Sequence, residues 1–129
     1  YTRNHSWNFE GGSRVEASAA PGFLGDESRV DPEEALVASL SSCHMLTFLA
    51  VAAKKRYVVD SYTDDAVGFM EKNTEGKLAI TRVVLRPRIV FSGERQPMTE
   101  QVDELHHIAH AECFIANSVK TEIIVEPTV

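Results

Sequence analysis

The side chains best suited to chemistry in this sequence are the thiols of Cys43 and Cys113, its only two cysteines, seventy residues apart. We predict a helix around each of them, because apolar residues recur there at spacings of three and four. The recurring positions are Leu36, Leu40, Cys43 and Thr47 on the first helix and Val102, Leu105, Ala109 and Cys113 on the second. Both thiols therefore face the side on which two helices would pack.

Two interpretations of these thiols remain open on spacing alone. A disulfide needs α-carbons about 4.4 to 6.8 Å apart, which neighbouring core helices can supply. Free cysteine is also among the most buried residue types and often acts as a small hydrophobe. The spacing therefore allows redox chemistry, and it equally allows a structural or small-ligand module with inert buried thiols.

Three histidines on the second predicted helix suggest an alternative, a metal-binding or ligand-binding protein without redox chemistry. His106 and His110 are four residues apart and could share a zinc ion, and His107, His110 and Cys113 follow at three-residue steps. The glutamate expected between the paired histidines of a metalloprotease is absent, and His106 and His107 point about 100° apart. Histidines in the C-terminal half of a helix are also favoured by its dipole.

Composition limits the remaining classes. With 129 residues, 43% of them hydrophobic and 25% charged, we predict one domain over residues 1–129. The net charge of -6 opposes binding to nucleic acid or to an anionic membrane, so neither is an expected partner. Two cysteines make no disulfide framework and no secretory signal is visible, so we expect a cytoplasmic protein. The sequence begins at Tyr1 rather than at a methionine, which leaves a preceding segment open.

The first helix has clear end signals. Asp31 suits the N-cap, Pro32 the first helical position, and Glu34 the reciprocal position of a capping box. We expect the helix to run to the basic residues 54–56, which suit its C-terminal dipole. Residues 35–53 carry no formal charge if His44 is neutral, but serines and a threonine interrupt them, so we expect this helix to be buried in protein rather than in a membrane.

The rest of the chain predicts an α+β fold. Residues 57–71 and 77–91 have the composition of two long strands, and the polar segment 72–76 ends in glycine, which favours an antiparallel hairpin. Pro87 places the second strand at an edge or at a bulge. Pro97 and Thr99 introduce the second helix, and residues 119–125 predict a last strand. Residues 1–30 combine an extended segment, residues 5–9, with glycine and proline turns.

Two segments resemble the OsmC/Ohr family of thiol-dependent hydroperoxide reductases. Residues 31–43, DPEEALVASLSSC, match its Pro-Glu helix start with a cysteine ten positions after the glutamate, and residues 109–113, AHAEC, match its second cysteine. The resemblance covers roughly residues 31–126. It implies an OsmC-like fold with antiparallel sheets wrapped around two central helices, and an intertwined homodimer with an active site near each subunit interface.

The resemblance also implies a role for each thiol. Cys43 would attack the peroxide and become a sulfenic acid, and Cys113 would condense with it to a disulfide. A dithiol reductant, lipoyl-type or other, would restore both thiols, without metal, flavin or haem as cofactor. Apolar neighbours of Cys43 such as Leu46 and Phe48 would favour an organic hydroperoxide over hydrogen peroxide.

Activation of Cys43 needs a further group, because an ordinary thiol of pKa about 8.5 is mostly protonated at neutral pH and Cys43 lies far from its helix N-terminus. By resemblance, an arginine held by Glu33 would supply the positive charge. We favour Arg14, which follows a Gly-Gly turn, with Arg3 and Arg29 as alternatives. One departure from the family pattern is Phe114, where family members often have proline.

Overall fold

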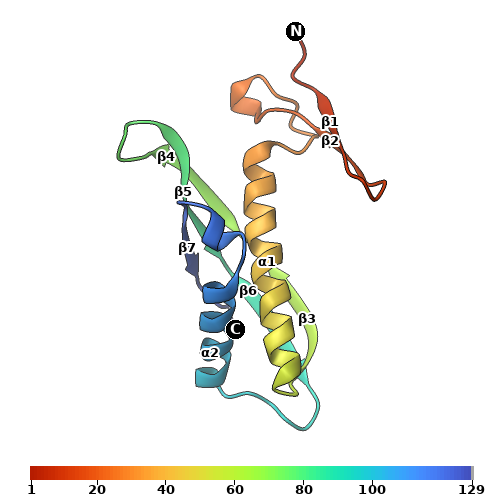
Figure 1. Cartoon of the computed structure of the whole chain (residues 1–129), viewed down its shortest axis with the longest axis vertical. Helices are drawn as coiled ribbons and strands as arrows, with labels where there is room; N and C mark the ends of the chain where they lie inside the picture. The colour runs from red at the N-terminus through yellow and green to blue at the C-terminus, as the bar shows by residue number, and fades with distance from the viewer. Residues whose placement is uncertain (129) are drawn as a thin grey trace. The chain divides into compact units, whose positions relative to one another are not determined.

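The computed structural model describes residues 1–128 and divides into two compact units, residues 1–36 and 37–129, each of which is described by itself. Figure 1 shows the order of their elements along the chain. The prediction that all 129 residues form one domain stays a prediction.

The first unit is built on a short antiparallel hairpin of β1 (His5–Asn8) and β2 (Arg14–Ala17). Its turn is closed by Phe9 N–H donating to the Ser13 carbonyl at 2.9 Å. Gly12 in this turn has a φ of 97°, which a residue with a Cβ rarely adopts. The extended segment and glycine turn predicted for this region are therefore confirmed; a 3₁₀ turn, η1 (Pro21–Phe23), follows them.

The helix α1 (Pro32–Lys54) begins and ends as predicted. The Glu34 amide donates to the Asp31 carboxylate at 2.8 Å and the Asp31 amide donates to the Glu34 carboxylate at 3.3 Å, which is the expected capping box. At the other end Arg56 adopts a left-handed φ of 64°. Its amide donates to the Ala53 carbonyl, and the next amide, that of Tyr57, donates to Ala52. This is a Schellman motif closed without glycine.

The two predicted long strands are each divided. The register is the same on both sides of these divisions, and it shifts by one residue farther out, between Val59 and Ser61 and between Phe69 and Met70. The strands are β3 (Val58–Asp64), β4 (Val67–Lys72), β5 (Leu78–Leu85) and β6 (Pro87–Ser92). Asp64 pairs with Pro87 and Val67 pairs with Val84, so β3–β6 and β4–β5 are successive parts of one antiparallel ribbon. Pro87 is the first residue of its strand, in a two-stranded sheet where every strand is an edge, as its missing amide requires.

The helix α2 (Thr99–Glu112) is followed by a 3₁₀ turn, η2 (Ala116–Ser118), and by β7 (Glu122–Val125). The strand β7 lies parallel to β5, so antiparallel pairing prevails in the fold but is not complete. The prediction that Cys113 lies within the second helix is wrong by one residue. Cys113 is the C-cap in an extended conformation, φ −69° and ψ 114°, and the chain leaves the helix there.

In the second unit α1 and α2 run antiparallel, and the ribbon of β3 and β6 lies beside them (Figure 1). The core contains Phe48, Ala52, Tyr57, Leu105 and Ala109, all at most 6% exposed. Phe48 packs edge-on against Tyr62 of β3, which joins helix and strand layers. By length and composition α1 could cross a membrane, a criterion that the core helix of a soluble protein also meets.

Candidate thiol site

The structure brings Cys43 of α1 and Cys113 at the end of α2 together, and both are free thiols. Cys43 is partly exposed, whereas Cys113 is 1% exposed. Each of the two thiols shifts the pKa of the other, so they lie close together. The helix α1 and the C-cap of α2 therefore bring the two cysteines near each other, and Cys43 is the more exposed of the two.

The surroundings of Cys43 favour its thiolate. Burial raises its pKa, but hydrogen bonds from the Ile115 amide, the Cys113 thiol and the Phe114 amide outweigh burial, and the pKa falls below the ordinary value of a thiol. Donors that point at the sulfur stabilise the anion more than the neutral thiol. Cys43 is thus the better nucleophile of the pair.

The surroundings of Cys113 favour its protonated form. Burial raises its pKa, the Ala116 amide lowers it, and donation to Cys43 together with the charge on Cys43 raises it again. The Ala116 amide lies 3.5 Å from the Cys113 sulfur. The pKa of Cys43 is therefore lowered and that of Cys113 raised from the ordinary value of a thiol.

Glu33 lies in the first turn of α1, ten residues before Cys43 on the same helix. Its Oε2 atom is buried and has no hydrogen-bond partner among the described residues. A buried carboxylate oxygen without a donor is costly, and it creates a place for a cationic or N–H donor. This agrees with the role that the resemblance gives to Glu33, which stays a prediction.

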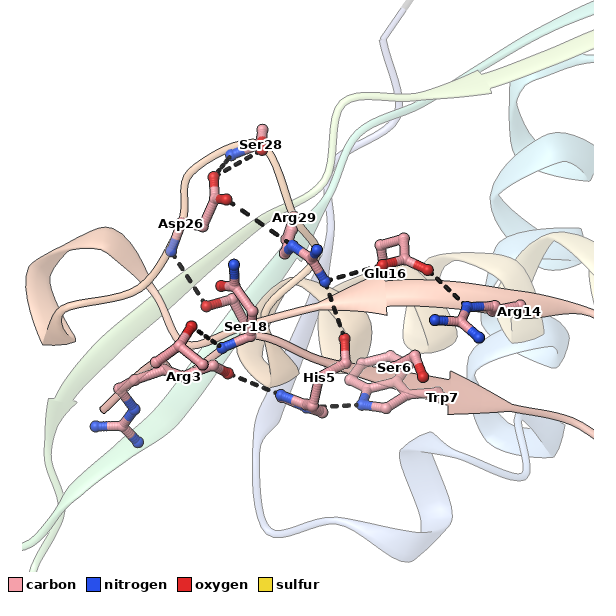
Figure 2. Close-up of polar contacts among 12 residues, drawn as sticks. Arg3, His5, Ser6, Trp7, Arg14, Glu16, Ser18, Asp26, Ser28 and Arg29 are labelled. Atoms are coloured by element: carbon pink, nitrogen blue, oxygen red, sulfur yellow. Dashed lines mark hydrogen bonds and ion pairs between the residues drawn. The ribbon is translucent and has the colours of Figure 1, made fainter.

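The three candidate arginines all lie in the first unit, and Figure 2 shows the ion pairs of Arg14 and Arg29. Arg29 is the most enclosed: its guanidinium donates to Glu16 at 2.9 Å and to the His5 carbonyl at 3.1 Å. Arg14 pairs with the other oxygen of Glu16 at 2.7 Å and leaves 61% of its side chain exposed. Arg3 donates to the Phe23 carbonyl at 3.4 Å. Which of them serves Cys43 stays a prediction.

Sequence reasoning missed a buried pair of histidines between the two helices. His44 Nε2 lies 3.0 Å from His106 Nδ1, and the rings are stacked with centroids 5.3 Å apart. His44 is 1% exposed and is therefore a core residue. Nothing in the sequence indicates its partner, because the two residues are brought together only by the packing of α1 on α2.

This pair also bears on the metal-binding alternative. His106 is committed to His44, whereas His107 and His110 are exposed. No group of three or more histidine, cysteine, aspartate or glutamate side chains among residues 1–128 is arranged to hold a metal ion. The structure therefore does not assemble His106, His107 and His110 into a ligand set.

A protein-family model and a solved structure both relate this chain to OsmC-like proteins. The family model described as OsmC-like protein matches residues 25–128. The structure is similar to that of OsmC-like protein VCA0330, of unknown function, from Vibrio cholerae, with 56% identity, a TM-score of 0.97, and coverage of 99% of this chain and 86% of the other. No curated protein matches the chain.

Two more distant structures share the fold. An organic hydroperoxide resistance protein from Legionella pneumophila is 15% identical, with a TM-score of 0.80 over 98% of this chain and 90% of the other. An organic hydroperoxide resistance protein from Elizabethkingia anophelis, with thiocyanate bound, is 22% identical, with a TM-score of 0.76 over 98% and 88%. At these identities the likeness is one of fold.

Proposed function

Since the chain belongs to the OsmC-like protein family, we propose that it is a thiol-dependent hydroperoxide reductase in which Cys43 is the nucleophile and Cys113 the resolving thiol. The observation that carries the proposal is the nearness of two free thiols of unequal exposure and acidity, with Cys43 partly exposed and lowered in pKa and Cys113 buried and raised in pKa. Such an asymmetric pair is what a two-cysteine peroxide reduction needs.

The reaction is a two-electron oxidation of the thiol pair. The Cys43 thiolate attacks one peroxide oxygen, the O–O bond breaks, and the alkoxide takes a proton and leaves as an alcohol, so that Cys43 becomes a sulfenic acid. The sulfur of Cys113 then attacks the sulfenic sulfur, and the hydroxyl leaves as water with the Cys113 proton. The disulfide is reduced by a dithiol, which is oxidised to its own disulfide.

The side chains near the site favour an organic hydroperoxide as the substrate. Leu46, one turn after Cys43 on α1, is 60% exposed and Phe114 is 79% exposed, so apolar surface is available for the alkyl part of an organic hydroperoxide. A cytoplasmic location would supply the reducing dithiol. We also propose that the protein works as a homodimer, as the resemblance implies.

A peroxide-consumption assay tests the proposal. Cumene hydroperoxide and hydrogen peroxide are compared as substrates, with dihydrolipoamide as reductant. We expect turnover of the organic substrate that is lost in Cys43→Ser and sharply reduced in Cys113→Ser. Ser42→Ala, on the exposed side of the same helix turn, is the matched control. Turnover that survives Cys43→Ser would refute the assignment of the nucleophile, and absence of turnover in the native protein would refute the function.

A further inference from the structure

The chain turns directly after α2, and a hydrogen bond to the Cys113 sulfur lies within this turn. The helix ends at Glu112, and Cys113 is extended, with φ −69° and ψ 114°. Three residues farther on, the Ala116 amide donates to the Cys113 Sγ atom at 3.5 Å. The resolving thiol of the proposed reaction is thus held by a main-chain donor from its own turn.

Two further hydrogen bonds hold this turn in place. The Asn117 amide donates to the Cys113 carbonyl at 3.0 Å, and the Asn117 side chain donates to the Ala111 carbonyl at 3.2 Å, in the last turn of α2. The Ala116 N–H is therefore oriented before any charge develops on the sulfur. This is the condition under which main-chain donors stabilise an anion well.

The resolving step places a charge on a sulfur that water hardly reaches. Cys113 is 1% exposed, and burial raises the pKa of its thiol, whereas the Ala116 amide lowers it. In the resolving step Cys113 loses its proton, its sulfur bonds to the Cys43 sulfur, and the S–O bond of the sulfenic acid breaks, so that hydroxide takes up a proton and leaves as water. An N–H donor binds a charged sulfur more strongly than a neutral one, so its effect is greatest in this step.

We propose that the main-chain N–H of Ala116 is a catalytic group of the resolving step, because it donates to the reacting sulfur of Cys113 and stabilises the charge that develops there. The inference rests on the proposed function for its catalytic meaning, but the hydrogen bond is a property of the reduced protein. All of its groups lie within the unit of residues 37–129. The methyl group of Ala116 takes no part, so any residue except proline could supply the donor at this position.

An ester in place of the amide at residue 116 removes the donor and keeps the methyl group. A synthetic peptide of residues 113–129, with lactic acid in place of alanine at 116, can be ligated at Cys113 to a recombinant thioester of residues 1–112. The reference is the same ligated chain with alanine. An ester also weakens the preceding carbonyl, that of Ile115, which accepts from the Ser118 amide at 3.0 Å. The matched control is therefore an ester at residue 118, which removes that bond and leaves the Ala116 N–H in place.

The first readout is the pKa of Cys113 in a Cys43→Ser background, followed by NMR of a ¹³C label at the Cys113 Cβ atom. Relative to the reference, we expect the ester at 116 to raise this pKa by about one unit and the ester at 118 to leave it unchanged. Equal pKa values for the reference and the 116 ester would overturn the proposal.

The second readout separates the two chemical steps in protein that has both thiols. After one equivalent of cumene hydroperoxide, loss of peroxide reports the attack by Cys43, and mass spectrometry of acid-quenched samples reports the disulfide. We expect the ester at 116 to slow disulfide formation about tenfold and to leave the loss of peroxide unchanged. Unchanged disulfide formation, or an equal slowing of both steps, would contradict a role in resolution.

A third measurement needs no change at residue 116 and decides the matter if the ester does not fold. In Cys43→Ser protein, the ¹⁵N resonance of Ala116 is detected through the Ile115 carbonyl carbon, so that amide exchange at high pH does not erase it. This resonance should move with the ionisation of Cys113, and the movement should be absent in Cys43→Ser/Cys113→Ser. A resonance that ignores the ionisation of Cys113 would refute the inference.

Failure of this proposal and failure of the proposed function give different results. A protein that consumes no hydroperoxide, but whose Cys113 pKa responds to the ester at 116, has the hydrogen bond and refutes the proposed function. A protein that turns over hydroperoxide, and whose Cys113 is indifferent to the ester, refutes only the role of Ala116.

Discussion

The buried histidine pair makes the stability of this protein depend on pH in a calculable way. Burial lowers the pKa of His44 from 6.5 to about 4, with further lowering by His106 and His110 and a smaller opposite effect from Asp64. Burial likewise lowers the pKa of His106 from 6.5 to about 4. Between these values the unfolded chain binds more protons than the folded one, so the free energy of unfolding falls as pH falls through this window.

The size of the effect follows from the two pKa values. With 6.5 in the unfolded chain and about 4 in the folded chain, each histidine removes about 2 kcal/mol between pH 7.5 and pH 5.0. The pair together removes about 4 kcal/mol, a large share of the 5 to 15 kcal/mol typical of a domain. Carboxylates with ordinary pKa values remain mostly ionised over this range and add little.

Urea denaturation at pH 7.5 and pH 5.0, followed by circular dichroism, measures this difference. The double variant His44→Leu/His106→Leu removes both partners, and its unfolding free energy should lose about 4 kcal/mol less than that of the native protein on acidification. His107→Asn removes an exposed histidine of the same helix and should behave as the native protein does. The reasoning is refuted if native and double-variant proteins show the same pH dependence, or if NMR places the midpoints of both imidazoles above pH 6.

Three further predictions concern other elements. Arg56→Gly should raise the free energy of unfolding by about 0.5 to 1 kcal/mol, because glycine adopts the left-handed φ at the α1 C-terminus without strain. Ala50→Gly, at an exposed position inside the helix, should lower it by about 1 kcal/mol, and thermal and urea unfolding measure both. Asp31→Ala should cost about 1 kcal/mol, since the Glu34 amide loses its acceptor, and an unchanged urea midpoint would contradict this. Arg14→Ala should raise the alkylation pKa of Cys43 if Arg14 is the activating arginine, and a profile equal to that of the native protein would transfer the role to Arg3 or Arg29.

Local signals in the sequence predicted local structure well. The Asp31–Glu34 capping box, the proline at the start of α1 and the glycine turn between β4 and β5 act over three to five residues, so the sequence contains all the groups involved. The sequence also predicted that both thiols lie on the sides where the two helices pack, because helical spacing determines which side of each helix carries them. The OsmC-like fold followed from the resemblance and is confirmed.

Features that depend on packing between distant elements were not predicted. The contact of His44 with His106 spans 62 residues and has no local signature. The end of α2 at Glu112 was also missed, because no glycine marks it and the Asn117 side chain, which caps Ala111, lies six residues beyond.

The shared register of the β3–β6 and β4–β5 pairs has a consequence for how this chain can change its length. Asp64 opposite Pro87 and Val67 opposite Val84 belong to one alignment that passes through both interruptions. Each pair also contains one single-residue register shift, where Asp60 of β3 and Thr81 of β5 have no strand partner, so the ribbon accommodates a single extra residue in one arm as a bulge. Related chains should therefore gain or lose residues at the tip, residues 73–77, in matched numbers on both arms, or singly at these two bulges.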